Sequence, residues 1–329
     1  MVLAKAVTID GKGGPEVLSI GELQVEDPGP GELLVEVAAA GLNRADTLQR
    51  RGFYPAPPGA PAQVPGLEYA GTVAAIGSGV TDHAVGDRVM GIVAGGGMAT
   101  HLTVHAREAI AVPDSMTLSD AGAIPEVFLT AYDALNLQGG MSMGNRVLLH
   151  AVGSGIGTAA MQLAAATGAS VIGTSRSADK LERCAKLGAL TPIHVQDKRF
   201  AKQVLEVTGG AGVDLVLDTV GAAYLADNIK ALSVGGHVVV IGLLGGATAE
   251  LPMGLLLAKR ASITGTVLRS RPLEEKASLA QSFSREAMPL FATGQLQPVV
   301  DRVMPMEEIG DAHAYMESDQ SFGKVVMTW

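Results

Sequence analysis

The sequence predicts an α/β protein made of a β-rich unit and a doubly wound parallel sheet. Two features of the chain support this fold class. Short apolar strands separated by Gly and Pro fill the first half, and from Asn145 onward apolar strands alternate regularly with helices. A length of 329 residues is too great for one ordinary domain and fits two.

The first half of the chain has the pattern of strands and turns. Its apolar or alternating segments are KAVTI, LSIGELQV, ELLVEVAAAG and AGTVAAIG. The dense prolines between Pro55 and Pro65 predict a long irregular loop. From Ser119 the segment SDAGAIPEVFLTAYDALN is typical of a helix, and Pro125 predicts either a kink or a new start.

The second half alternates between the two kinds of element. RVLLHAV, SVIGT, DLVLDTV and HVVVIGLLG are apolar strands, and segments such as GTAAMQLAAATG and SADKLERCAKLG are helical. This order predicts a parallel sheet covered by helices on both faces. The tail returns to strand, helix, strand, with Ile309, Ala312, Tyr315 and Met316 on the apolar face of its helix.

Composition and charge exclude several classes of protein. The net charge is −9 and no basic run exceeds QRR, which disfavours binding to nucleic acid. No apolar run reaches the roughly 18 residues of a membrane span, and the first residues lack the features of a signal peptide. We therefore expect a cytoplasmic protein that acts on a small molecule and has no membrane partner. The lone Cys184 excludes an internal disulfide and a cysteine metal cluster.

A glycine-rich segment lies between the first strand and helix of the second half. Its residues predicted to cradle a dinucleotide pyrophosphate are Gly153, Ser154, Gly155, Ile156 and Gly157. Backbone amides and the helix dipole favour a phosphate at such a turn. Three alternating glycines also occur in ordinary tight turns, but their place at the head of a βαβ series favours nucleotide binding.

The end of the next strand indicates which nucleotide is preferred. An NAD site usually carries an acidic residue there for the ribose 2′-hydroxyl, whereas this chain has Ser175, Arg176 and Ser177, followed by Lys180. Both cations can neutralise a 2′-phosphate, so we expect NADPH as cofactor. The alternative is that they are solvated charges at a helix start.

Polar residues follow the apolar run ELLVEVAAA, in the segment GLNRADTLQRRGFY. Asn43, Arg44, Asp46 and Tyr54 could form a metal site, supply an acid or base, or face water. Two further acids in apolar surroundings, Glu68 and Glu126, are interpreted as buried hydrogen-bond partners. His101 and His105 share the polar face of a predicted strand, which favours solvent exposure over a metal site.

The segment PGLEYAGTVAAIGSGV carries a family resemblance. Gly66, Glu68, Gly71 and Gly77 match the G-H-E-x-x-G-x(5)-G-x-x-V pattern of zinc alcohol dehydrogenases, with Leu67 in place of the zinc-ligand His. No Cys lies near Asn43 and the four-cysteine zinc loop is absent, so no metal is expected. The chain resembles the zinc-free, zeta-crystallin-like quinone oxidoreductase branch of the medium-chain dehydrogenase/reductase superfamily. It is most similar to the branch's tumour-suppressor-induced enzymes over nearly the whole chain.

The resemblance implies a fold, a cofactor and a set of site residues. It implies a GroES-like catalytic domain of residues 1–125 completed by 267–329, an inserted Rossmann NADPH-binding domain of residues 126–266, and a homodimer. Asn43 and Tyr54 would bind the reacting oxygen at the mouth of an interdomain cleft. Further cofactor contacts carried over from the family are Thr130, Gly242, Leu243, Leu244, Thr266 and Leu268.

The sequence therefore predicts an NADPH-dependent quinone oxidoreductase that transfers hydride to ortho- or para-quinones without zinc. Amide and phenol donors can stabilise the charge that develops on the quinone oxygen. Two alternatives remain at this point. The same donors would suit an enone or enoyl thioester reductase, and a protein that only holds NADPH would act as a redox sensor.

Overall fold

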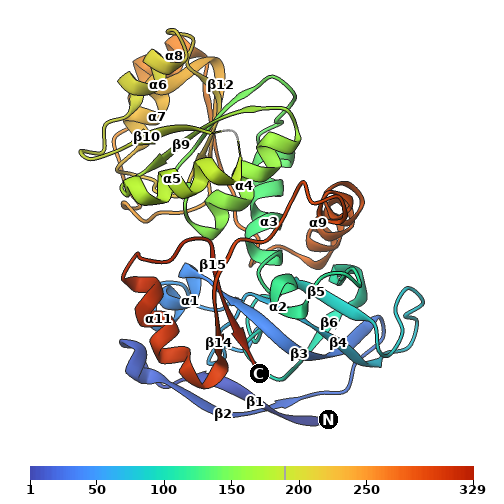
Figure 1. Cartoon of the computed structure of the whole chain (residues 1–329). Helices are drawn as coiled ribbons and strands as arrows, with labels where there is room; N and C mark the ends of the chain where they lie inside the picture. The colour runs from blue at the N-terminus through green and yellow to red at the C-terminus, as the bar shows by residue number, and fades with distance from the viewer. Residues whose placement is uncertain (189) are drawn as a thin grey trace. The chain divides into compact units, whose positions relative to one another are not determined.

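The computed structural model describes every residue except residue 189, and the chain divides into two compact units. Unit 1 contains Met1–Leu129 and Leu268–Trp329, and unit 2 contains Thr130–Val267. The colours of Figure 1 show both chain ends in unit 1, which contains blue and red segments. The second unit is thus an insertion in the first, and each is described by itself below.

Unit 1 is built on a seven-stranded sheet whose main order is β14-β15-β3-β4-β5-β7, with β6 also paired to β3. The long strand β3 pairs antiparallel with β4, β6 and the C-terminal β15, so the last strand of the chain lies beside one of the first. The strands are β3 (Glu32–Leu42), β4 (Glu68–Ile76), β5 (Arg88–Ile92), β6 (His101–His105), β7 (Ile110–Ala111), β14 (Val300–Pro305) and β15 (Lys324–Thr328). Strands β1 (Val2–Ile9) and β2 (Leu18–Val25) form a separate antiparallel pair.

Apolar side chains at every second position of the strands of unit 1 point to the same face of the sheet and form its core. The core side chains over β3, β4, β5 and β6 are Leu33, Val35, Val37, Tyr69, Val73, Val89, Leu102 and Val104. Polar residues between them, such as Glu36, point away from this core, as the period of two in a strand requires. The apolar stripe predicted for the tail helix is also confirmed, because Ile309, Ala312 and Met316 are buried in a second cluster and the partly buried Tyr315 packs against it.

Helices of unit 1 begin and end where the sequence supplies signals. Helix α1 (Arg44–Arg50) follows β3 directly, and α2 (Leu118–Ala121) begins after Thr117, whose hydroxyl accepts the Asp120 N–H. Pro125 starts a new helix, α3 (Pro125–Tyr132), rather than kinking a longer one. Proline is well placed there because a first-turn residue needs no N–H donor. After the inserted unit come α9 (Leu273–Glu286), α10 (Met288–Ala292) and α11 (Ile309–Glu317).

Unit 2 is a parallel six-stranded sheet of order β10-β9-β8-β11-β12-β13. The chain runs outward from β8 to one edge, returns to β11, and continues to the other edge. Right-handed crossovers then place helices on opposite faces, as in a Rossmann fold, so the predicted α/β fold class is confirmed. The strands are β8 (Arg146–Leu149), β9 (Ser170–Ser175), β10 (Thr191–His194), β11 (Val213–Asp218), β12 (Leu232–Val240) and β13 (Ser262–Gly265).

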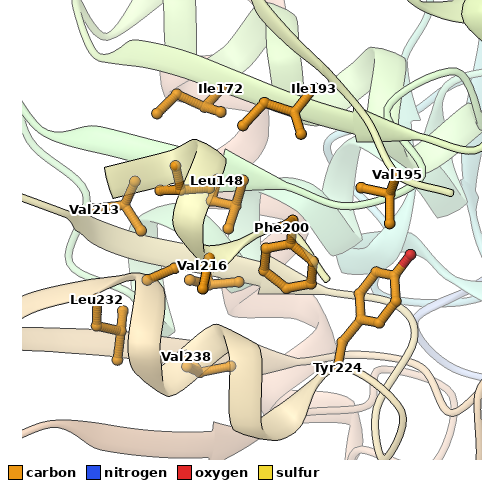
Figure 2. Packing of buried hydrophobic residues seen from close by; sticks show 13 residues of the cluster. Leu148, Ile172, Ile193, Val195, Phe200, Val213, Val216, Tyr224, Leu232 and Val238 are labelled. Atoms are coloured by element: carbon orange, nitrogen blue, oxygen red, sulfur yellow. The ribbon is translucent and has the colours of Figure 1, made fainter. Parts of the chain in front are cut away.

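The described residues of unit 2 form five α-helices after β8. They are α4 (Gly155–Ala166), α5 (Ala178–Leu187), α6 (Ala201–Val207), α7 (Leu225–Ala231) and α8 (Met253–Lys259). An apolar core packs between the sheet of unit 2 and its helices α6 and α7 (Figure 2). In Figure 2 the rings of Phe200 and Tyr224 lie side by side, with centroids 4.9 Å apart. Across the described part of the chain, no helix is both long and apolar enough to cross a bilayer.

Candidate functional site

The turn from β3 into α1 is held by a buried carboxylate. Asp46 Oδ2 accepts the backbone N–H of Asn43 at 2.8 Å, and Asp46 Oδ1 accepts the N–H of Gly66 at 3.0 Å. These bonds cap the helix and tie it to the loop before β4. Burial raises the pKa of Asp46 to about 6, although both amide hydrogen bonds act in the opposite direction.

The side chain of Asn43 is fully engaged inside unit 1. Its Nδ2 donates to Gly41 O at 3.1 Å and to Glu68 Oε1 at 2.8 Å. Its Oδ1 accepts from Lys324 Nζ at 2.7 Å. A primary amide has two N–H groups, and both are used here.

Lys324 is the cation at the centre of this cluster. Its ammonium donates to Leu42 O at 3.1 Å, Asn43 Oδ1 at 2.7 Å and Glu68 Oε1 at 2.6 Å. All three N–H groups of the ammonium are therefore satisfied, which offsets the cost of burying a charge. The side chains of Lys324 and Glu68 are only 4% and 0% exposed.

Glu68 joins the cluster to α3 through its second oxygen. Glu68 Oε2 accepts the backbone N–H of Glu126 at 2.9 Å, in the first turn of that helix. The carboxylate of Glu68 thus links β3, β4, α3 and β15. Sequence reasoning predicted a buried hydrogen-bonding role for Glu68, and the structure confirms it.

Tyr54 is positioned by Arg269, a residue that sequence reasoning missed. The Arg269 guanidinium donates to Ala94 O at 2.7 Å, Tyr54 O at 3.1 Å and Gln49 Oε1 at 2.5 Å. Its carbon lies 4.8 Å from the centroid of the Tyr54 ring, in cation–π geometry. The Tyr54 hydroxyl makes no hydrogen bond with any described residue, and partial burial raises its pKa, so it stays protonated at neutral pH.

Glu126 is a half-buried acid whose carboxyl group has no hydrogen-bond partner among the residues described. Loss of hydration raises its pKa to about 8, and the negative charge of Glu68 acts in the same direction. At neutral pH Glu126 is therefore mostly protonated. When Glu126 is ionised, its negative charge adds to the effect of burial in raising the pKa of Tyr54.

In unit 2 the glycine segment forms the N-terminus of α4. Ser154 is the N-cap, and its Oγ accepts the Gly157 N–H at 3.1 Å. The N–H groups of Gly155 and Ile156 lie in the first turn, where no intrahelical acceptor exists, and can bind a phosphate. A Cβ on Gly157 would lie 2.5 Å from Ala151 O, so only glycine permits this close approach of helix and loop.

The strand end after β9 presents hydroxyl and cationic groups. Ser177 caps α5 by accepting the Lys180 N–H at 3.3 Å, and Ser175 Oγ accepts the Ser177 N–H at 3.1 Å. Arg176 is exposed. The stem of Lys180 covers the glycine loop, because a Cβ on Gly153 would lie 2.8 Å from Lys180 Cβ. Lys180, in the first turn of α5, thus lies against the glycine loop, and Arg176 follows β9 directly.

The residues carried over from the family resemblance have different environments. The Thr130 hydroxyl is buried without a hydrogen-bond partner among the described residues and does not bond back to its own helix. Thr266 Oγ1 donates to Asp133 Oδ2 at 2.9 Å. Leu268 is 4% exposed and belongs to unit 1. Gly242 begins the loop after β12, where Leu243 and Leu244 are exposed.

Two family models match the chain, the first within unit 1 and the second over most of unit 2 and the first residues after it. The "alcohol dehydrogenase GroES-like domain" matches residues 29–114, and the "zinc-binding dehydrogenase" model matches residues 155–285. A quinone oxidoreductase of Pseudomonas aeruginosa is 31% identical, with 99% of each chain covered. The chain belongs to the medium-chain dehydrogenase/reductase superfamily. Within the superfamily it falls in the quinone oxidoreductase branch that the sequence motifs predict.

The chain is also similar to other oxidoreductases. A 2-haloacrylate reductase of Burkholderia sp. is also 31% identical, with 99% of each chain covered. The crystal structure of the Escherichia coli quinone oxidoreductase complexed with NADPH superposes with a TM-score of 0.88 at 30% identity, covering 99% of this chain and 100% of the other. Membership makes the protein an oxidoreductase that binds a nicotinamide dinucleotide. Among its described residues, no three His, Cys, Asp or Glu side chains are grouped to hold a metal ion.

Proposed function

We propose that this medium-chain reductase uses NADPH to reduce quinones, with the Tyr54 hydroxyl as the donor to the quinone oxygen. The observation that carries the proposal is the Tyr54 phenol, whose ring face contacts the Arg269 guanidinium and whose O–H donates to none of the described residues. Negative charge develops on a quinone oxygen as it is reduced, and a placed O–H donor stabilises that charge.

Unit 2 has the features that an NADPH site needs. The Gly155 and Ile156 amides suit the pyrophosphate, and Arg176 and Lys180 suit a 2′-phosphate. The Thr130 hydroxyl has no hydrogen-bond partner among the described residues and is a buried polar group that a bound ligand would satisfy. When bound, NADPH supplies the hydride. The Escherichia coli relative solved with NADPH supports this choice of cofactor.

Asn43 acts differently from Tyr54 in this proposal. Both of its N–H groups are donated within the protein, so donation to substrate requires one of them to leave Gly41 O or Glu68. We propose that Asn43 orients the end of β3 and holds Lys324, and that Tyr54 supplies the donor to substrate.

A second candidate function is reduction of an activated alkene. The name of the Burkholderia relative specifies a haloacrylate, whose double bond is conjugated to a carboxylate. Hydride addition to such an alkene places negative charge on the carboxyl oxygens of an enolate-like intermediate. The same Tyr54 hydroxyl would stabilise it.

The test is oxidation of NADPH by the purified protein, followed by loss of nicotinamide absorbance. Parallel reactions contain an ortho-quinone, a para-quinone, a small enone, a haloacrylate or no acceptor. Rapid loss with quinones and a fall of about 10²-fold in Tyr54→Phe support the proposal. Phe53→Leu is the matched control, because Phe53 is an exposed neighbour in the same loop. Activity on alkenes alone establishes the second function, and tight NADPH binding with no acceptor reduced contradicts both.

A further inference from the structure

We infer that His150 is a positioning residue for the cofactor, because it joins the glycine loop, residues 151–157, to the loop that follows β11. The inference rests on the proposed NADPH site at the N-terminus of α4 and extends it to the residues that keep its loops in place. His150 directly precedes the glycine loop and is only 1% exposed. It therefore acts on a bound nucleotide through its neighbours and not by contact.

On one side the His150 ring is bound to β9. Its Nδ1 lies 2.8 Å from Thr174 Oγ1, and the backbone O of Thr174 accepts the N–H of Val152 at 3.0 Å. Thr174 thus holds the chain on both sides of Ala151, whose φ of 48° is a left-handed conformation that is unfavourable for a residue other than glycine. Such a conformation persists only where the surrounding contacts fix it. Ala151 O in turn accepts the N–H of Ser154, the N-cap of α4, at 2.8 Å.

On its other side the ring is bound to α7 and through it to β11. His150 Nε2 lies 2.7 Å from Asn228 Oδ1, and Asn228 Nδ2 donates to Asp218 Oδ2 at 2.9 Å. Asp218 Oδ1 accepts the N–H groups of Val220 at 2.7 Å and Gly221 at 2.9 Å. The hydrogen-bond chain therefore ends in the loop after β11. His150, Asn228 and Asp218 are all almost completely buried.

The loop after β11 is joined in turn to the loop after β12. Val220 O accepts the N–H of Gly245 at 2.7 Å, and Gly246 O accepts that of Ala222 at 3.0 Å. All three loops follow the carboxyl ends of parallel strands, and β8 and β11 are the neighbours at which the strand order reverses. A doubly wound sheet binds its nucleotide at this position. A change at His150 should therefore alter the spacing of the loops on both sides of the nucleotide site.

The partners fix the direction of each hydrogen bond in the chain. The Asp218 carboxylate only accepts, so the Asn228 amide directs its N–H to Asp218 and its oxygen to His150. The His150 Nε2 must then carry a hydrogen. Burial lowers the pKa of His150, although the negative charge of Asp218 acts in the opposite direction, so the ring is neutral at neutral pH. Nδ1 therefore accepts the Thr174 hydroxyl, which lies closer to it than to Leu149 O at 3.5 Å.

Calorimetry of NADPH binding tests the inference. His150→Phe keeps the ring packing against Phe200 and Tyr224, whose centroids lie 4.7 Å from that of His150, and removes both hydrogen bonds of the imidazole. We expect the Kd of NADPH to rise about tenfold, which corresponds to the loss of about one net hydrogen bond. His150→Gln can place an amide N–H where Nε2 donates to Asn228, and it should recover part of the lost affinity.

His237→Phe is the matched control in the same sheet. His237 Nε2 bonds to Thr264 Oγ1 at 2.9 Å, which makes a histidine–threonine pair between β12 and β13. Its replacement should leave the Kd of NADPH unchanged. An unchanged Kd in His150→Phe would overturn the inference, and so would an equal rise in His237→Phe, because general damage to the sheet would then explain the loss. If the wild-type protein does not bind NADPH, the proposed cofactor site itself is wrong and the inference fails with it.

Nitrogen NMR of wild-type protein labelled with ¹⁵N-histidine supplies a second readout. The signals of His150 are those absent from the spectrum of His150→Gln. We expect a neutral ring with its hydrogen on Nε2 at neutral pH, as the bond to Asn228 Oδ1 requires. A ring with its hydrogen on Nδ1, or a charged ring, would contradict the order of hydrogen bonds through which His150 reaches the loop after β11.

Discussion

Removal of the Lys324 ammonium tests whether the buried cluster of unit 1 depends on this one cation. In Lys324→Met, Glu68 Oε1 keeps only the Asn43 donor, and Leu42 O and Asn43 Oδ1 lose theirs. Removing one partner of a buried ion pair costs about 3–5 kcal/mol of unfolding free energy, because the other charge remains buried. Methionine fills most of the lysine volume, so the loss comes from charge and hydrogen bonds rather than from a cavity.

Urea unfolding followed by tryptophan fluorescence measures this loss. Trp329 is the only tryptophan and packs on the core of unit 1, so its emission reports that unit. With an m-value of about 2 kcal/mol/M, a loss of about 4 kcal/mol moves the midpoint down by about 2 M. Lys186→Met, in an exposed pair with Glu182, should leave the midpoint unchanged.

A double variant separates an uncompensated charge from a general loss of packing. Lys324→Met with Glu68→Gln removes both charges. The amide oxygen can keep the Glu126 N–H as donor, and the amide nitrogen can donate to Asn43 Oδ1, which has lost its Lys324 donor. The double variant should regain most of the stability lost in the single variant. If the single variant loses less than about 1 kcal/mol, or the double variant is less stable than the single one, the reasoning about the ion pair is wrong.

The remaining predictions concern stability against pH and the nucleotide site. Burial, aided by the charge of Arg50, lowers the pKa of His313 from 6.5 to about 3. The neutral imidazole therefore contributes its full share of the unfolding free energy above about pH 6.5, and this share is lost as pH falls toward 3. His313→Gln should reduce the slope of unfolding free energy against pH in this range by up to about 1.4 kcal/mol per pH unit. Gly157→Ala should weaken NADPH binding in calorimetry at least tenfold because of its 2.5 Å backbone contact, whereas Gly254→Ala in α8, with open space around it, should not. Arg176→Ala should raise the Kd of NADPH but not that of NADH, and equal effects would contradict its assignment to the 2′-phosphate.

Much of the fold could be predicted because its signals are local. The alternation of strand and helix after Asn145 predicts a parallel sheet, and the glycines between β8 and α4 predict the tight helix start. The end of β3 was also predicted as a polar site. Each of these features depends on residues within one or two elements, where periodicity and turn chemistry act.

The site residues that sequence reasoning did not find come from segments far apart in the chain. Lys324 and Glu68 are 256 positions apart, and Arg269 and Gln49 are 220 apart. No local period reports such contacts, and the only signal for Lys324 was a lysine inside the apolar strand KVVMT. Asn43 shows a related limit of sequence reasoning. The sequence identifies the amide as a possible donor to substrate, but it does not show that both N–H groups already donate to Gly41 O and Glu68 Oε1. For Glu126, the prediction of a buried hydrogen-bond partner was wrong, because its side chain is half-buried and its carboxyl group bonds to none of the described residues.

The pairing of β15 with β3 has a consequence for how the protein is made. Unit 2 is contiguous in the chain, so all of its strands can meet once the ribosome has released residues up to Val267. Unit 1 is completed later, because the last residues of β3, 39–42, gain β15 as a neighbour, and Glu68 gains its ammonium partner, only after Lys324 has emerged. Until then the nascent chain carries an exposed strand edge and an unneutralised acid. Synthesis of the last strand thus completes both the sheet and the charge balance of the site.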